Sequence, residues 1–199
     1  MTNRDLELNA TELEKELNVK ECHLLNDWES IGYSIPLMTK NDFKVIKNGN
    51  MENSQTCLAI GPGTGLGFSV LRHVGNVPYV YPTELGNARS YNDHLSNLFD
   101  IDNSKNFIVL EDYLSGTGIK KIYAEKSGQN LTTEEIVSGY LDDDLAKFIL
   151  NNFVVALNNV MQDLALTFNA KGGIFFAGSL MRTISEMSSI NYICLLYTS

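Results

Sequence analysis

The feature of this sequence with the clearest chemical meaning is a loop of four alternating glycines, Gly61, Gly63, Gly65 and Gly67. Because glycine has no Cβ, the backbone N–H groups of such a loop can come close to a phosphate, and Thr64 adds a hydroxyl donor. No Lys-Ser/Thr pair follows as in a Walker loop, and a dinucleotide-binding loop would lead into a helix instead of a strand. Phosphate binding is one interpretation, and a tight hairpin connection is the other.

A second candidate is the pair Asn26-Asp27, which follows the apolar run of residues 22–25. We expect this run to be a buried strand, and ligand sites of α/β proteins favour the carboxyl ends of strands. A carboxylate there can accept the proton of an attacking hydroxyl, and an amide beside it can orient the same substrate. The alternative is that this pair starts a helix, because Asn and Asp are also preferred N-cap residues.

Three further positions, two carboxylates and one glycine turn, are candidates for ligand binding. Glu84 and Glu111, when each is taken alone, fit an exposed surface carboxylate better than a ligand-binding residue. Gly178 follows an apolar segment and precedes Ser179, so it fits either a close approach of an aromatic base or a plain strand-to-helix turn.

The elements that must position these residues alternate between helix and strand patterns, which predicts an α/β fold. A long helix from Asp143 to Phe168 is expected to be mostly buried, because its apolar residues spread around much of its surface. Strands are expected at 22–25, 43–46, 56–60, 68–74 and 78–81, and a last one at 173–178 runs into a glycine turn. Further helices are expected after a Thr11 cap, at Trp28–Leu37, and at 91–99, 112–126 and 132–139.

Composition narrows the class of partner. The 199 residues include 24 acidic and 15 basic ones, for a net charge of −9, and this balance argues against a nucleic-acid binder. No apolar run reaches the roughly 18 residues of a membrane span, and the start is too acidic for a targeting peptide. Three cysteines and three histidines without ligand spacing argue against a disulfide framework or a metal site. We therefore expect a cytoplasmic protein that handles a small ligand, without a membrane or nucleic-acid partner.

Five segments, taken in chain order, resemble the bacterial-type glucokinase family. The family has a ribonuclease H-like fold of the actin and hexokinase type. Leu24-Leu25-Asn26-Asp27-Trp28 resembles its apolar-Asn-Asp-Phe segment, and residues 60–67 resemble its Gly-Ala-Gly-Thr-Gly-Leu-Gly phosphate loop. Residues 82–87, 111–119 and 172–180 resemble two sugar-binding segments and the adenosine segment. The match runs from residue 1 to about 187.

The resemblance implies a glucokinase that uses ATP and Mg²⁺ to phosphorylate glucose or a similar hexose. It implies Asp27 as the catalytic base and gives sugar-binding roles to Asn26, Asp27, Glu84, Asn87 and Glu111. The implied nucleotide-binding residues are Gly61, Gly63, Thr64, Gly65, Gly67 and Gly178. A homodimer is a further expectation. The alternative function is a non-catalytic sugar- or nucleotide-binding regulator of the same fold.

The sequence also departs from the family pattern. Asn87 stands where the family has a sugar-contacting His, which alters one hydrogen bond worth about 0.5–1.5 kcal/mol. Ser179 replaces a glycine, and the Asp-x-Gly-Gly-Thr-Asn first phosphate loop has no counterpart. We therefore expect an incomplete chain with impaired activity. Residues 1–55 would belong to the small domain, 56–190 to the large domain, and 191–199 to a non-native tail.

Overall fold

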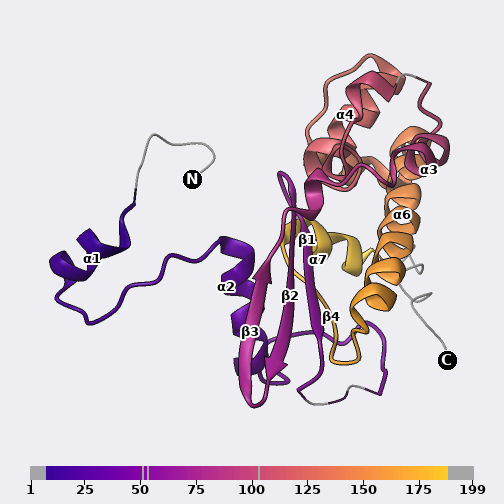
Figure 1. The fold of residues 1–199 in the computed structure, drawn as a ribbon. Helices are drawn as coiled ribbons and strands as arrows, with labels where there is room; N and C mark the ends of the chain where they lie inside the picture. Colours follow the sequence, from indigo (N-terminus) through magenta and orange to yellow (C-terminus); the bar gives the residue numbers. More distant parts are fainter. Residues whose placement is uncertain (1–7, 51, 53, 103, 188–199) are drawn as a thin grey trace.

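A four-stranded mixed sheet forms the centre of the computed structural model, which describes residues 8–50, 52, 54–102 and 104–187. The strand order is β3-β2-β1-β4, with β1 antiparallel to β2 and parallel to β4, and β2 antiparallel to β3 (Figure 1). The strands are β1 (Cys57–Pro62), β2 (Leu66–Val74), β3 (Val77–Pro82) and β4 (Gly173–Phe176).

The alternation of side chains along the strands gives the sheet two different faces. Leu58 and Ile60 of β1 point into the main hydrophobic core with Phe68 and Val70 of β2. Their neighbours in sequence point the other way, into a smaller cluster that contains Cys57, Ala59, Leu71 and Val80. Each face therefore needs its own helical cover.

The main core is covered by helices that follow the hairpins in sequence. The longest, α6 (Asp144–Phe168), starts at the Asp143 N-cap and ends where Asn169 takes the left-handed conformation. Its buried residues spread around much of its surface, as expected for a central helix. The other α-helices after the hairpins are α3 (Asn92–Phe99), α4 (Gly116–Ser127), α5 (Thr133–Ser138) and α7 (Ser179–Glu186). Short 3₁₀ turns are η2 (Leu85–Asn87), η3 (Ser104–Asn106), η4 (Leu110–Asp112) and η5 (Gly139–Leu141).

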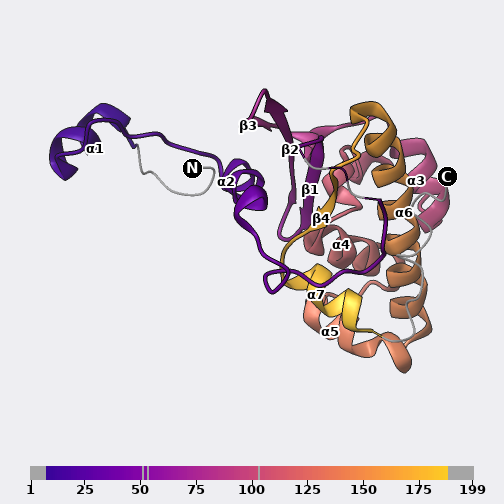
Figure 2. The ribbon, with the colours of Figure 1, turned by 90° about the horizontal axis from the view of Figure 1, so that it is seen from below.

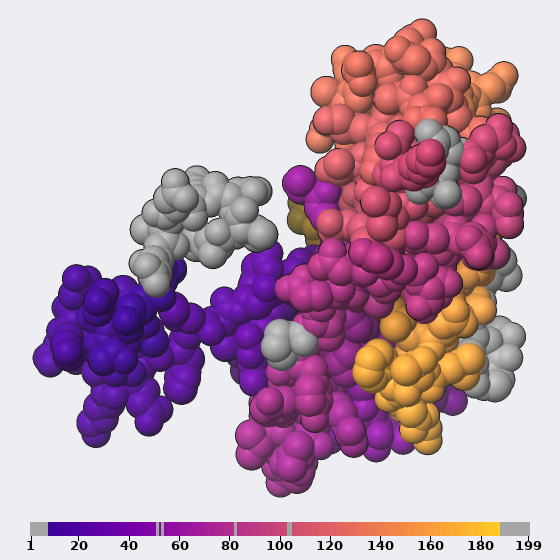
Figure 3. Space-filling view, turned by 45° about the horizontal axis from the view of Figure 1, so that its top comes forward, coloured from indigo at the N-terminus to yellow at the C-terminus, as the bar shows by residue number. Residues whose placement is uncertain are grey.

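The smaller face of the sheet is covered by α2 (Asp27–Ser34) and the turn η1 (Ile35–Leu37). The first helix, α1 (Ala10–Leu17), has no buried residue and lies well apart from the sheet (Figures 1 and 2). In the space-filling view, the N-terminal part joins the body through a narrow neck (Figure 3). The segment that precedes α2 is therefore attached to the body of the protein mainly through the packing of α2 on the sheet.

Most of the expected elements are confirmed, and the exceptions have physical causes. Residues 22–25 and 43–46 are not strands, because in the described part of the chain no neighbouring strand pairs with them. Thr11 is not the cap of α1; the Asn9 side chain accepts the Thr11 N–H instead. The expected Trp28–Leu37 helix starts at Asp27, and its end around Pro36 is a 3₁₀ turn.

The expected 112–126 helix also starts later than the sequence suggested. A 3₁₀ turn ends at Asp112, and Ser115 then caps a separate helix, α4, by accepting the Gly118 N–H at 2.8 Å. No helix in the described ranges is long and apolar enough to cross a bilayer. The division at residue 55 stays a prediction, and the tail at 191–199 lies outside the described residues.

Candidate active site

The glycine loop connects β1 and β2 as a hairpin. Gly61 pairs with Gly67 and Pro62 with Leu66, and at the tip the Gly63 N–H donates to the Gly65 carbonyl at 2.8 Å. The glycines with positive φ in the described chain are Gly75, Gly128, Gly173 and Gly178, so the four glycines of this hairpin do not serve a left-handed turn. The absence of their Cβ atoms must instead matter because neighbouring groups come close.

Three of these glycines lie against a side chain from another segment. A Cβ on Gly67 would overlap the Trp28 indole at Nε1, and a Cβ on Gly61 would lie 2.6 Å from its Cζ2. A Cβ on Gly65 would lie 2.8 Å from Glu111 Oε2. Only Gly63, of the four, has open space, with no atom within 4 Å of such a Cβ. The exposed tip at Gly63 and Thr64 is therefore the part of the hairpin that a phosphate can reach.

Glu111 is joined directly to the hairpin. Its Oε2 accepts the Leu66 N–H at 3.3 Å, which uses one acceptor position of one carboxylate oxygen. The Glu111 side chain is half-buried, so its second oxygen stays available to a ligand. A carboxylate in this position can accept hydrogen bonds from the hydroxyls of a sugar.

The turn that presents Glu111 is held by its neighbour, Asp112. The Asp112 Oδ2 accepts the N–H groups of Ile108 and Val109 at 2.8 and 2.9 Å, and Lys121 Nζ donates to its Oδ1 at 2.6 Å. Partial burial opposes ionisation of Asp112, but the hydrogen bonds from Lys121 and the two amides outweigh it and lower the pKa of this carboxyl. Asp112 therefore stays charged and keeps the turn closed.

The second candidate sugar-binding segment packs against the same carboxylate. Gly86 lies so close to Glu111 that a Cβ there would be 3.0 Å from Oε2, and the Leu110 N–H donates to the Ala88 carbonyl at 2.8 Å. Glu84 and Asn87 on this turn are exposed, and Asn87 Nδ2 donates to Glu84 Oε2 at 3.4 Å. Their polar groups are free to exchange this contact for a ligand.

Asn26 and Asp27 form the start of α2, so the expected strand edge at this position is wrong. The Asn26 side chain accepts the Trp28 N–H at 2.8 Å, and Glu29 reaches back to the Asn26 N–H in a capping box. Asp27 is the first helical residue, and its Oδ1 also accepts the Trp28 N–H, at 2.9 Å. Both side chains are exposed. The N-cap interpretation holds for Asn26, and the Asp27 carboxylate faces solvent.

Two helix starts also meet the hairpin. The Gly116 N–H, at the first residue of α4, donates to the Gly63 carbonyl at 2.7 Å. Gly178, the N-cap of α7, has φ of 102°, and a Cβ there would be 3.7 Å from the Pro62 carbonyl oxygen. Helix N-termini favour anions, so two partial positive charges lie close to the hairpin tip.

The family model for glucokinase matches residues 1–191. The chain belongs to the glucokinase family. The glucokinase of Saccharophagus degradans is 26% identical over 97% of this chain and 64% of that protein. The glucokinase of Colwellia psychrerythraea is 29% identical over 91% of this chain and 60% of that protein. The chain therefore spans less than two thirds of the length of these curated relatives.

Solved structures give the same fold. A glucokinase from an Antarctic psychrotroph superposes with a TM-score of 0.74 at 25% identity, over 92% of this chain and 66% of that one. A ROK family glucokinase from Streptomyces griseus, solved in complex with glucose and AMPPNP, gives 0.56 at 13% identity, over 92% and 60%. The α/β fold of this glucokinase-family chain is therefore the actin-like ATPase fold, as expected.

In this member of the glucokinase family, the four other segments with site residues each contact the glycine hairpin. Glu111 and Gly86 touch its second strand, and Gly178 lies beside the end of its first. The segment with Asp27 contacts the hairpin through the next residue, Trp28. Sequence reasoning missed Trp28 and the amide of Gly116. Gly61 and Gly67 lie symmetrically about the hairpin tip, and this symmetry was the signal in the sequence that a large side chain such as Trp28 packs against both.

Proposed function

We propose that this chain is part of an ATP-dependent hexose kinase, an enzyme that converts glucose to glucose 6-phosphate. The observation that carries the proposal is the hydrogen bond from the Leu66 N–H to Glu111 Oε2, because it joins a candidate sugar-binding carboxylate to the glycine hairpin. The Streptomyces griseus structure with glucose and AMPPNP supports both substrates through the shared fold.

In the proposed reaction, the primary hydroxyl of the sugar attacks the γ-phosphorus of ATP. The new O–P bond forms as the bond to the ADP oxygen breaks, and Asp27 accepts the hydroxyl proton. The Asp27 Oδ1 accepts its own helix N–H, so Oδ2 is the oxygen we propose for the proton. Asn26, Glu84, Asn87 and Glu111 would hold the other hydroxyls and thereby orient the attacking oxygen.

The nucleotide would lie along the hairpin tip and the two helix starts. We propose that Gly63, Thr64 and Gly65 contact the phosphates, because Gly63 is open and Thr64 is exposed. Gly61 and Gly67 would act indirectly, since they lie against Trp28. Gly178 would border the adenosine. Among the described residues no group of three metal-binding side chains occurs. Mg²⁺ would therefore arrive with ATP, held mainly by phosphates and water, and would neutralise developing charge.

The test is a coupled assay of ADP release by the full-length protein, with MgATP and a panel of glucose, mannose and fructose, combined with calorimetric glucose binding. The kinase makes ADP only when sugar is present, and Asp27→Asn lowers kcat by about 10²–10⁴-fold. Asp142→Asn, on an exposed carboxylate in a distant turn, is the matched control. Sugar binding without any ADP release would contradict the proposal and favour the regulator. A cytoplasmic location and a homodimer stay predictions.

A further inference from the structure

Trp28, the single tryptophan of the chain, packs closely against a pair of glycines. Gly61 and Gly67 are cross-strand partners, and both face α2 at the glycine end of the hairpin. A Cβ on Gly67 would overlap the indole at Nε1, Cε2 and Cδ1, while a Cβ on Gly61 would overlap Cη2. The two glycines therefore form a seat that spans the whole length of the indole.

The rest of α2 fits the sheet in the same close way. Gly32 follows Trp28 by one helical turn and is buried. A Cβ there would lie 2.7 Å from Val80 Cγ1 and 2.9 Å from Ser69 Oγ. Ile35, one further turn along, is 8% exposed in the same cluster. This stripe of Trp28, Gly32 and Ile35 fixes how α2 lies on the sheet. A shift along the helix axis would replace Gly32 with a residue that has a side chain, and that side chain would collide with Val80.

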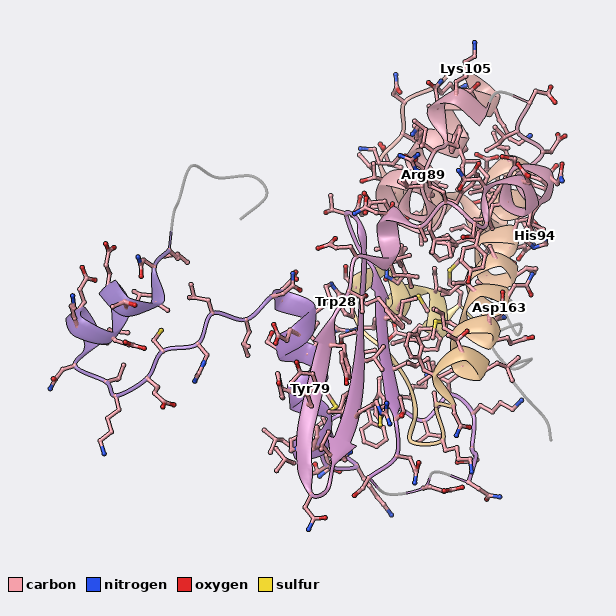
Figure 4. The ribbon with its side chains drawn as sticks, in the orientation of Figure 1. Trp28, Tyr79, Arg89, His94, Lys105 and Asp163 are labelled. Atoms are coloured by element: carbon pink, nitrogen blue, oxygen red, sulfur yellow. The ribbon has the colours of Figure 1, made fainter. Side chains whose placement is uncertain are left out.

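Asp27 is the first residue of this fixed helix, and its side chain has few contacts of its own. Its carboxylate contacts only the Trp28 N–H among the hydrogen bonds of the described chain, and the preceding residues Leu24 and Leu25 are 49% and 48% exposed. Figure 4 shows Trp28 between α2 and the strands, on the opposite side of the sheet from His94 and Asp163. The indole is therefore the nearest side chain that can transmit the position of the hairpin to Asp27.

We propose that Trp28 is a positioning residue that sets the place of Asp27 relative to the phosphate-binding tip, a role that rests on the proposed function. Trp28 itself does not touch the reacting atoms. When the indole occupies its seat, the first turn of α2 lies at the end of the hairpin that carries Gly63 and Thr64. When the seat is lost, α2 can tilt and the proton acceptor moves away from the attacking hydroxyl.

The proposal predicts a particular kinetic signature. A misplaced proton acceptor matters in the transition state more than in the bound ground state, so kcat falls while the KM for glucose changes little. A displacement of about 1 Å in an active site can cost about 100-fold in rate. We expect Trp28→Ala to lower kcat by about 10- to 100-fold, and Trp28→Phe to restore at least a third of the wild-type value because a ring still fills part of the seat.

A substitution cycle tests the seat without relying on turnover. Trp28→Ala should lower the melting temperature by about 5–15 °C, and Gly67→Ala should lower it too, because its methyl group displaces the indole. In the Trp28→Ala background, Gly67→Ala should lower the melting temperature by less than a third of the shift that it causes in the wild-type protein. Gly61→Ala should stay costly in both backgrounds, since its Cβ would also lie 2.5 Å from the Ala177 carbonyl oxygen. Equal costs of Gly67→Ala with and without the indole would overturn the seat.

The control for a merely structural role is Ile31→Ala. Ile31 lies on the same helix and packs against the same cluster, but it is absent from the close neighbours of Gly61 and Gly67. We expect Ile31→Ala to lower the melting temperature while kcat stays within threefold of wild type. Equal losses of kcat in Ile31→Ala and Trp28→Ala would overturn the positioning role. Absence of ADP release by the full-length wild-type protein would refute the proposed function and the positioning role together. The melting-temperature cycle decides separately whether the two glycines seat the indole.

Discussion

Glu111 and Leu66 are 45 positions apart in the sequence, and a 3.3 Å hydrogen bond from the Leu66 N–H to Glu111 Oε2 joins them. Leu66 is the first residue of β2, so this bond fixes the carboxylate beside the tip of the glycine hairpin. A sugar held by Glu111 would therefore lie next to a phosphate held by the hairpin tip, which is the geometry that phosphoryl transfer needs.

The first prediction concerns Glu111 itself. Glu111→Ala removes the acceptor of the Leu66 N–H and the proposed contact to the sugar, so glucose binding should weaken by about 10- to 100-fold, as for a lost hydrogen bond to a charged group. Isothermal titration calorimetry measures this change. Glu125→Gln, on an exposed carboxylate of α4, should leave the dissociation constant within twofold of wild type. Equal affinities of wild type and Glu111→Ala would remove Glu111 from the sugar site.

The second prediction separates two glycines at the same tip. A Cβ on Gly65 would push the end of the Glu111 side chain, which can move, so Gly65→Ala should cost about 1 kcal/mol or less in stability. It should weaken glucose binding by about two- to tenfold, because the carboxylate is displaced. A Cβ on Gly63 meets open space where we place the phosphates, so Gly63→Ala should weaken nucleotide binding more than glucose binding. The same ligand preference in both variants would contradict this arrangement.

The sequence was a good guide to elements whose pattern is local. The alternation in residues 68–74 and the long apolar helix starting at Asp143 carry their own signal, and both elements formed as expected. The run at 22–25 has the composition of a buried strand, but a strand also needs a partner, and in the described chain none lies beside it. Hydrophobic composition alone could not reveal that Leu24 and Leu25 are half exposed.

The site was predictable as a set of segments but not as a set of contacts. The glycines of the loop suggested either phosphate binding or a tight hairpin connection. The structure shows the hairpin, and three of the glycines lie against Trp28 or Glu111, which neither interpretation included. These contacts depend on the register of β1 with β2 and on where α2 lies, and neither can be read from local periodicity. The roles assigned to Asn26, Glu84, Asn87 and Gly178 stay predictions.

The third prediction concerns the backbone at Gly178. Its φ of 102° and ψ of 159° lie in a region that is essentially restricted to glycine, whereas its nearest neighbour leaves ordinary space for a Cβ. Gly178→Ala should therefore cost about 1–3 kcal/mol through backbone strain alone. Urea unfolding measures this cost. Gly49→Ala, at an open position without positive φ, is the matched control and should be neutral. If Gly178→Ala leaves the free energy of unfolding unchanged, the strand-to-helix turn can adopt a backbone conformation that alanine tolerates, and the prediction is wrong.

The last prediction is a pH dependence that originates at Asp112. Because its pKa is lowered in the folded protein, ionised Asp112 stabilises the fold above its usual pKa of 3.8, and this contribution is lost as the pH falls below that value. Asp112→Asn should therefore reduce the free energy of unfolding at pH 7 by about 1 kcal/mol, and the difference from wild type should shrink by pH 3. Urea unfolding at pH 7, 5 and 3 measures it, with exposed Asp142→Asn as the control. A difference that stays constant with pH would mean that shape, and not the charge of Asp112, holds the Glu111 turn.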